Sequence, residues 1–191
     1  MGYIFTGIDD WDLKIGGVPS GGLTVLLMPM TFPAPYLNNK MIQSLKNCVL
    51  IDKRGDVIRD SLIKIRSGGI KLLSCMDVNH IESNMIYPTI EECIKVIDKS
   101  KIMVYINDAQ EVFDVLLKQD KKTIRDFVGM EITTIAVIYR GDMPFNKKFA
   151  DDIDNMASLI MEVKGLGKDY VEVNVLRDET GFTSKEIMVY I

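Results

Sequence analysis

The sequence predicts an α/β fold, a three-layer sandwich with a mostly parallel central sheet and an antiparallel β-hairpin extension at its C-terminal end. Two patterns lead to this prediction. Short apolar segments alternate with helical patterns over the first two thirds of the chain, and such an order requires crossover connections between parallel strands. The final third instead alternates apolar and polar residues around glycine-containing turns, which indicates antiparallel strands.

Four short segments are predicted to form the central strands. Each is almost entirely apolar or β-branched, as expected for strands that are buried on both faces. They are Leu23 to Met28, Cys48 to Ile51, Ile102 to Ile106 and Thr133 to Tyr139.

Helical patterns occupy the connections between these strands. The clearest begins at Thr89, where Thr-Ile-Glu-Glu forms a capping box with Glu92 at the third helical position. Proline suits the first turn of a helix, so Pro35 is expected to open another one. The remaining helices are predicted from Pro35 to Lys46, Arg54 to Ser67, Ala109 to Lys118 and Lys121 to Val128.

The last third of the chain predicts a hairpin and one further strand. Ser158 to Val163 and Tyr170 to Arg177 are joined by a turn at residues 165–169, and the second segment alternates in hydrophobicity. A final strand, Glu186 to Ile191, follows a turn at residues 178–181. These strands would extend the edge of the parallel sheet.

Length and composition indicate one globular domain over residues 1–191. Apolar residues make up 47% and charged residues 26% of the chain, and neither a membrane-spanning stretch nor a secretory signal is evident. We therefore expect a cytoplasmic protein without membrane insertion. The net charge of −4 gives no general attraction to nucleic acid.

Metal and nucleophile chemistry finds little support in the sequence. The three cysteines, Cys48, Cys75 and Cys93, form no C-x-x-C pair, and His80 is the only histidine. A zinc site needs several such ligands at suitable spacing, and a Ser-His-Asp hydrolase needs an exposed serine elbow. We expect buried thiols, no resident metal and no cofactor.

Two motifs near the N-terminus carry a family resemblance. The chain reads Thr6-Gly-Ile-Asp-Asp-Trp-Asp-Leu13 and then Gly16-Gly-Val-Pro-Ser-Gly-Gly-Leu23. In residue type and spacing it resembles the opening T-G-I-x-x-L-D-x-L element and G-G-[IV]-P-x-G-x-L turn of KaiC-like and RadA-like ATPase domains of the RecA superfamily. Trp11 stands where that family usually has leucine. The resemblance covers nearly the whole chain, implies a RecA-like fold, and would suit an archaeal source.

The family's phosphate-binding loop, G-x-x-x-x-G-K-[ST], is degenerate here. That loop binds phosphate through backbone N–H groups and a lysine, and it binds magnesium through a hydroxyl. Ala34 stands at the lysine and Pro35 at the hydroxyl, while Pro33 replaces the second glycine, so two N–H donors are lost. The eight aligned positions are Met28, Pro29, Met30, Thr31, Phe32, Pro33, Ala34 and Pro35.

The resemblance also locates the acidic residues of an active site. The catalytic glutamate would end the second strand, where Asp52 is the nearest match. The magnesium-binding aspartate would end the third strand, a position taken by Asn107, with Asp108 directly after it. Asp52 and Asp108 are weak catalytic candidates. Lys40 is a candidate replacement for the lost lysine, and a surface lysine is the simpler interpretation.

A third candidate site follows the fourth strand. RecA-like recombinases carry DNA-contacting loops there, and this sequence has Arg140, Lys147 and Lys148. A solvated loop leading into a helix accounts for them more simply.

Three functions follow from the resemblance. The first is a pseudo-ATPase, a RecA-like domain without catalysis that regulates or scaffolds a protein partner, which is an active paralogue or a second copy. The second is an ATPase or kinase with a non-standard phosphate loop. The third is a DNA recombination accessory protein, for which nucleic acid binding is the less favoured expectation.

Overall fold

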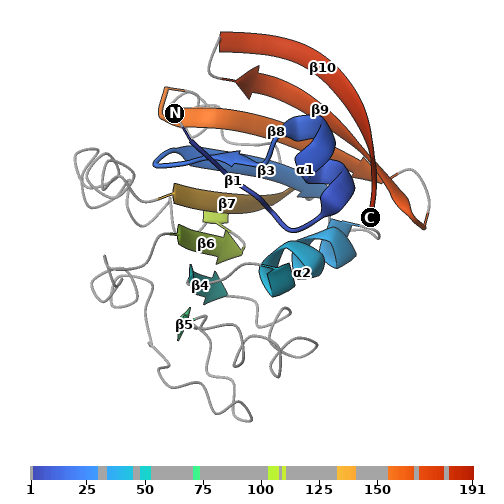
Figure 1. The fold of residues 1–191 in the computed structure, drawn as a ribbon. Helices are drawn as coiled ribbons and strands as arrows, with labels where there is room; N and C mark the ends of the chain where they lie inside the picture. Colours follow the sequence, from blue (N-terminus) through green and yellow to red (C-terminus); the bar gives the residue numbers. More distant parts are fainter. Residues whose placement is uncertain are drawn as a thin grey trace.

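A computed structural model gives the fold of the chain, with its strands side by side in one large, twisted sheet (Figure 1). Helices and strands carry the labels of that figure. The residues that the structure describes are 2–29, 34–44, 48–52, 71–73, 103–107, 109–110, 133–140, 155–165, 168–178 and 181–191.

Among the described residues, eight strands form the main sheet in the order β10-β9-β8-β3-β7-β6-β4-β5. The pairs from β8 to β5 are parallel, and β8–β9 and β9–β10 are antiparallel. The strands are β3 (Leu23–Pro29), β4 (Cys48–Asp52), β5 (Lys71–Leu73), β6 (Met103–Asn107), β7 (Thr133–Arg140), β8 (Ala157–Gly165), β9 (Tyr170–Asp178) and β10 (Gly181–Tyr190).

The four predicted central strands are confirmed as β3, β4, β6 and β7. β3 lies between β7 and β8 and is parallel to both, so its side chains face the interior on both sides. Leu23, Leu26 and Met28 are fully buried. β5 was not predicted, because three residues are too few to show a period of hydrophobicity.

The predicted C-terminal hairpin and last strand are also confirmed. β10 begins at Gly181, earlier than the predicted start at Glu186, and its pairing with β9 shifts register between Phe182 and Lys185. A bulge of this kind places an extra residue in one strand and interrupts the alternation of side chains. The sequence pattern therefore becomes regular only after the bulge.

The first family-like motif forms a hydrogen-bonded bracket around helix α1 (Asp9–Ile15). Asp12 Oδ1 accepts hydrogen bonds from the backbone N–H of Thr6 (2.7 Å) and its hydroxyl (2.8 Å), and Asp12 Oδ2 accepts one from the Gly7 N–H (2.8 Å). Gly7 has a φ of 77°, which favours glycine. The motif thus fixes the entry of the chain into α1.

The second motif forms a turn in which one position, Gly17, requires glycine. Gly17 has a φ of +88°, and a Cβ built there would lie 2.5 Å from the carbonyl oxygen of Ile4. This close approach lets β1 (Tyr3–Ile4) pair with β2 (Val18–Pro19) in a small antiparallel sheet.

Helix α1 contacts the last strand of the described sheet through two side chains. Lys14 Nζ donates to the carbonyl oxygen of Met188 (2.8 Å), and the Tyr190 N–H donates to Asp10 Oδ2 (2.7 Å). Lys14 and Asp10 also form a salt bridge of 2.8 Å. The hydrogen bond from Lys14, followed by that from the Tyr190 N–H, lowers the pKa of Asp10.

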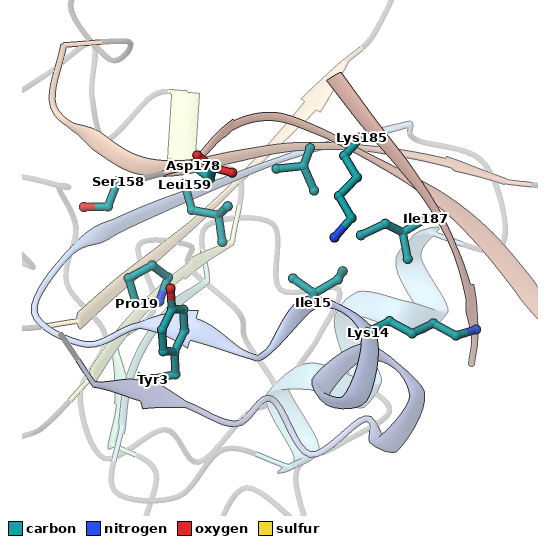
Figure 2. A pocket seen from close by; sticks show the side chains of 10 residues that line it. Tyr3, Lys14, Ile15, Pro19, Ser158, Leu159, Asp178, Lys185 and Ile187 are labelled. Carbon is teal, nitrogen blue, oxygen red and sulfur yellow. The ribbon is translucent and has the colours of Figure 1, made fainter. Parts of the chain in front are cut away.

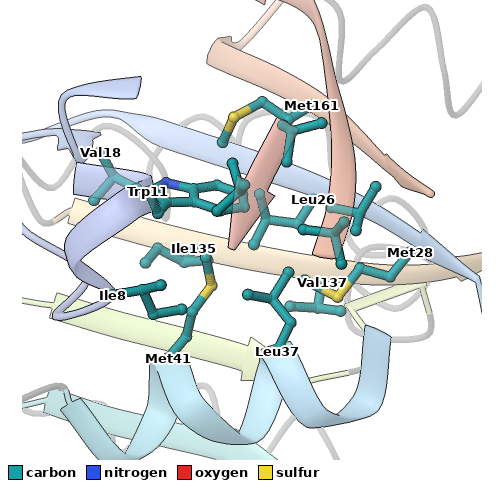
Figure 3. Packing of buried hydrophobic residues seen from close by; sticks show 14 of the residues in the cluster. Ile8, Trp11, Val18, Leu26, Met28, Leu37, Met41, Ile135, Val137 and Met161 are labelled. Atoms are coloured by element: carbon teal, nitrogen blue, oxygen red, sulfur yellow. The ribbon is translucent and has the colours of Figure 1, made fainter. Parts of the chain in front are cut away.

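Both described helices, α1 and α2 (Ala34–Ser44), cover the same face of the sheet. Figure 3 shows Trp11 of α1 and Leu37 and Met41 of α2 meeting Leu26 and Val137 of the central strands. None of these five side chains is more than 1% exposed. Trp11, where the resembled family has leucine, therefore lies in the hydrophobic core.

The opposite face of the central strands is buried as well. Leu27, Ile106, Ala136 and Ile138 are at most 5% exposed. Burial on both faces is the environment expected of the middle layer of a sandwich.

The predicted helices are tested only in part. α2 confirms the helix expected from Pro35, and Ala109 and Gln110 begin the next described helical turn. The helices expected at residues 54–67, from Thr89 and at 121–128 lie outside the described residues. No helix within the described ranges is long and apolar enough to cross a membrane.

Candidate functional site

The carboxyl ends of the parallel strands meet at one edge of the sheet, where open α/β sheets bind their ligands. The backbone register pairs Met28 with Tyr139 and Pro29 with Arg140 across β3 and β7. It also pairs Asp52 with Asn107 across β4 and β6. The topology therefore brings the strand-end positions that the sequence singled out to the same edge.

The aligned phosphate-loop positions connect β3 to α2. Met28 and Pro29 end the strand, and Ala34 and Pro35 open the helix. Residues 30 to 33, which are Met30, Thr31, Phe32 and Pro33, lie outside the described part of the chain. A strand thus leads into the aligned positions and a helix begins within them.

Pro35 reduces the number of backbone N–H donors that the start of α2 can direct at an anion. The first four N–H groups of a helix have no partner within it, and they form the usual phosphate-binding surface. Proline at the second position of α2 has no N–H to contribute. The same residue suits the first helical turn, so the helix forms with one N–H donor fewer at its start.

Four neutral side chains form a hydrogen-bonded cluster behind this edge, which we call the amide–phenol cluster. Asn38 Nδ2 donates to Asn107 Oδ1 (3.0 Å) and to the Tyr139 hydroxyl (2.9 Å). The Tyr139 hydroxyl donates to Asn107 Oδ1 (3.0 Å), and the Tyr105 hydroxyl donates to Asn38 Oδ1. The cluster therefore joins α2 to the ends of β6 and β7.

The cluster is almost completely withdrawn from water. Asn107 and Tyr105 are fully buried, Asn38 is 1% exposed, and Tyr139 is partly buried. Buried amides and hydroxyls cost free energy unless they are hydrogen-bonded. Both functional groups of Asn38 are used within the cluster, which makes the arrangement self-consistent without any bound group.

The donor set does not fit the magnesium ion that the family resemblance implies. Mg²⁺ is held by carboxylates, phosphate oxygens and water in octahedral geometry. The position that the resemblance gives to the metal-binding carboxylate is an amide, Asn107, whose oxygen already accepts hydrogen bonds from Asn38 and Tyr139. Within the described residues, no group of three or more histidine, cysteine, aspartate or glutamate side chains could hold a metal.

Sequence reasoning selected Asn107 but missed Asn38, Tyr105 and Tyr139. Asn38 lies 69 residues from Asn107, and Tyr139 lies 32 residues from it. No spacing rule links positions on one helix and two separate strands. A polar residue on the apolar face of α2, one turn after Ala34, was the available signal for Asn38.

The other candidate residues are placed as follows. Asp52 ends β4 beside Asn107 in the backbone register, and Arg140 ends β7, while Asp108, Lys147, Lys148 and His80 lie outside the described residues. Nothing is described of the side chains of Asp52 and Arg140.

Lys40 does not belong to the amide–phenol cluster. It follows Asn38 by two residues on α2, and residues two apart point to different sides of a helix. Its Nζ lies 5.5 Å from the centroid of the Tyr36 ring, in cation–π distance. Lys40 is half-buried, and its role as a replacement lysine stays a prediction.

Comparison of the chain with known proteins supports the fold. No protein-family model matches the sequence, and no curated protein matches it. Among solved structures, the chain is similar to the flagellar accessory protein FlaH from Methanocaldococcus jannaschii, with a TM-score of 0.65 and 13% sequence identity. The match covers 95% of this chain and 90% of FlaH. FlaH has a RecA-like ATPase fold. The sheet topology and this likeness together show that the chain has a RecA-like α/β fold.

Proposed function

We propose that this protein is a RecA-like pseudo-ATPase, which has lost magnesium-dependent nucleotide hydrolysis and acts through its surface as a regulatory or scaffolding partner of another protein. The observation that carries the proposal is the amide–phenol cluster. Neutral, mutually satisfied side chains occupy the strand ends where the resembled family holds magnesium and phosphate charge.

The electrostatics of this edge support the loss of nucleotide binding. A triphosphate needs several positive or N–H groups directed at it, and its magnesium ion needs a carboxylate. In this chain the lysine position is Ala34, the hydroxyl position is Pro35 and the carboxylate position is Asn107. A charge-assisted hydrogen bond such as the one from the lysine contributes roughly 1.5–3 kcal/mol, so its loss alone corresponds to about one to two decades of affinity, and the loss of two magnesium ligands adds to it.

The amide–phenol cluster also provides the connection between α2 and the strands that a bound nucleotide would otherwise make. It connects α2 to β6 and β7 through hydrogen bonds that exist without any bound nucleotide. A domain whose elements are connected without nucleotide can present the same surface to a partner at all times. FlaH is an accessory protein, and an accessory role in a larger assembly is the function that we extend to this chain.

Calorimetric titration with Mg-ATP and Mg-ADP tests the first half of the proposal. We expect no heat of binding and no rise in melting temperature up to millimolar nucleotide. An Asn38→Ala variant serves as a control that opens the amide–phenol cluster without restoring any charge, and it should behave in the same way. Micromolar binding by the natural sequence would contradict the proposal.

The proposed partner role is tested by the molecular mass of the protein in solution and by its binding to other proteins. Light scattering of the purified protein and affinity capture from its source cells should reveal a defined oligomer or a recurring protein partner that binds the purified chain directly. A strictly monomeric protein without such a partner would contradict a scaffolding role.

One observation favours a second candidate, an ATPase or kinase with a non-standard loop. Asp52 lies at the carboxyl edge, paired in register with Asn107, where a catalytic carboxylate would be placed. If the enzyme exists, Asp52→Ala should abolish a measured rate of ATP hydrolysis, and Asp52→Asn should do the same. A rate that is unchanged in both variants would assign the activity to a contaminant.

A further inference from the structure

A cavity of about 210 Å³ lies at the amino end of the parallel strands, opposite the amide–phenol cluster. Ser158 and Leu159 line it from the start of β8, which runs parallel to β3. Its other walls come from β1, β2 and the end of α1 on one side and from β9 and β10 on the other (Figure 2). This cavity is therefore separate from the carboxyl edge of the sheet, where the resembled family binds nucleotide.

The floor of the cavity is apolar. Leu159 and Val175 are each 6% exposed, and Ile15 and Ile187 are half-buried around them. An engineered apolar cavity of about 150 Å³ is large enough to take up benzene. The space here is sufficient for an apolar body of that size together with one small polar group.

Lys185 is an unusual residue for its position on β10. It shares a face of the strand with Ile187, Val189 and the following Ile191, of which Val189 and Ile191 belong to the hydrophobic core. The register shift that ends at Lys185 determines which face of β10 its side chain lies on. Bulges commonly redirect a side chain in this way. Lys185 is exposed as a whole, and Figure 2 shows its side chain lying beside Ile187 with the ammonium directed toward Ile15.

The Lys185 ammonium is available for a ligand, because it makes no hydrogen bond or ion pair with the described part of the chain. The other lining charges are engaged. Lys14 is bound by Asp10 and by the Met188 carbonyl oxygen, and Asp178 has its own contact within the fold. The cavity therefore offers a single uncommitted positive charge.

Two hydroxyl groups complete the polar rim. Tyr3 and Ser158 line the cavity, and neither makes a hydrogen bond within the described structure. Figure 2 shows Tyr3 on the side of the cavity opposite Lys185. An ammonium can donate up to three hydrogen bonds, so Lys185 by itself can satisfy the acceptors of a carboxylate, and the two hydroxyls line the far side of the cavity.

We propose that this cavity is a binding site for a small monocarboxylic acid with a short apolar body. The carboxylate would pair with Lys185, and the apolar body would lie on Leu159, Val175 and Ile187. A small number of polar groups over an apolar floor is the usual composition of a ligand site. The site is independent of the proposed pseudo-ATPase function.

The test is an NMR titration with three probes of nearly the same shape at constant ionic strength: benzoate, benzyl alcohol and benzylammonium. We expect benzoate to give saturable shifts of the backbone amides of Val175 and Ile187, with at least tenfold weaker binding of the other two. The Lys185→Met variant should weaken benzoate binding about tenfold, which corresponds to about 1.4 kcal/mol, and Lys185→Arg should retain it. Lys168→Met, at an exposed lysine of the β8–β9 turn, is the matched control and should leave the affinity unchanged.

A second variant keeps the proposal testable if Lys185→Met alters β10. Ile15→Phe should fill the cavity and abolish the benzoate shifts while Lys185 remains in place. Equal binding of all three probes would overturn the proposal, because it would show an apolar void without selection for an anion. Unchanged benzoate affinity in Lys185→Met would also overturn it, and Lys185 would then be only an inward-facing lysine of a peripheral strand.

Discussion

The two ends of the parallel strands differ in how their polar groups are satisfied. At the carboxyl end, Asn38, Asn107 and Tyr139 are bonded to one another and almost fully enclosed. At the amino end, Lys185 faces a cavity and makes no hydrogen bond or ion pair within the described residues. Closed hydrogen bonding stabilises a fold but offers nothing to a ligand, whereas an uncommitted group beside apolar surface does. Among the described residues, the uncommitted polar group therefore lies at the amino end of the strands.

The largest effect is expected from Asn107→Asp, which places a carboxylate of nearly the same shape in the amide–phenol cluster. Burial without a cation raises the pKa of an aspartate above its ordinary value of about 3.9. The penalty is therefore absent well below pH 4 and develops as the pH rises above it, reaching about 3–5 kcal/mol of unfolding free energy at pH 7. Urea unfolding of the variant and the natural protein, at a pH well below 4 and at pH 7, measures this penalty.

The exposed Asn155 provides a matched control for this change, because Asn155→Asp should alter stability by no more than about 0.5 kcal/mol. Recovery of the Asn107→Asp variant by millimolar Mg²⁺ would show that the carboxyl edge still accepts a metal. That result would remove the distinction between the two ends of the sheet.

Gly17→Ala should give the next largest effect, at the turn that precedes β2, whose Pro19 lines the cavity. The new Cβ would lie 2.5 Å from the Ile4 carbonyl oxygen at a φ of +88°, so we expect a loss of about 2–4 kcal/mol from strain and displacement of β1. Gly16 has a similar φ of +92° but open space around it. Gly16→Ala should therefore cost only about 1–2 kcal/mol. Equal losses of stability in chemical unfolding would show that β1 moves away without cost.

A double-mutant cycle measures the cooperation within the amide–phenol cluster. Asn38→Ala and Tyr139→Phe should each cost about 1–3 kcal/mol, and the double variant should cost less than their sum by about 0.5–1.5 kcal/mol, because the two side chains share a hydrogen bond. Simple additivity in urea unfolding would mean that the two residues stabilise the carboxyl edge independently.

The smallest effect concerns Asp10. The hydrogen bonds from Lys14 and the Tyr190 N–H depress its pKa in the folded state, so its contribution is present above its ordinary pKa and is lost as the pH falls through the folded value. The difference in stability between the natural protein and Asp10→Asn should shrink as the pH is lowered from 6 to about 3. A constant difference over that range would show that the charge of Asp10 has no part in the contact.

Much of the fold could be predicted because it depends on local patterns. β3 and β7 are largely apolar or β-branched segments, and β9 alternates in hydrophobicity after a glycine-containing turn. Asn107 could be selected as a changed site residue because its strand is easily recognised. Its partners could not be identified, since three separate elements must fold before Asn38, Tyr105 and Tyr139 meet. The Lys185 site depends in the same way on a bulge that leaves no local signature.

The contact between α1 and β10 has a consequence for how this protein can associate. A strand at the margin of a sheet presents unpaired N–H and C=O groups that can recruit a strand from another molecule. Here the Tyr190 N–H is taken by Asp10 and the Met188 carbonyl by Lys14, so the C-terminal half of β10 cannot add a foreign strand unless α1 moves away. Extension of the sheet by a strand from another molecule is therefore hindered along this half of β10.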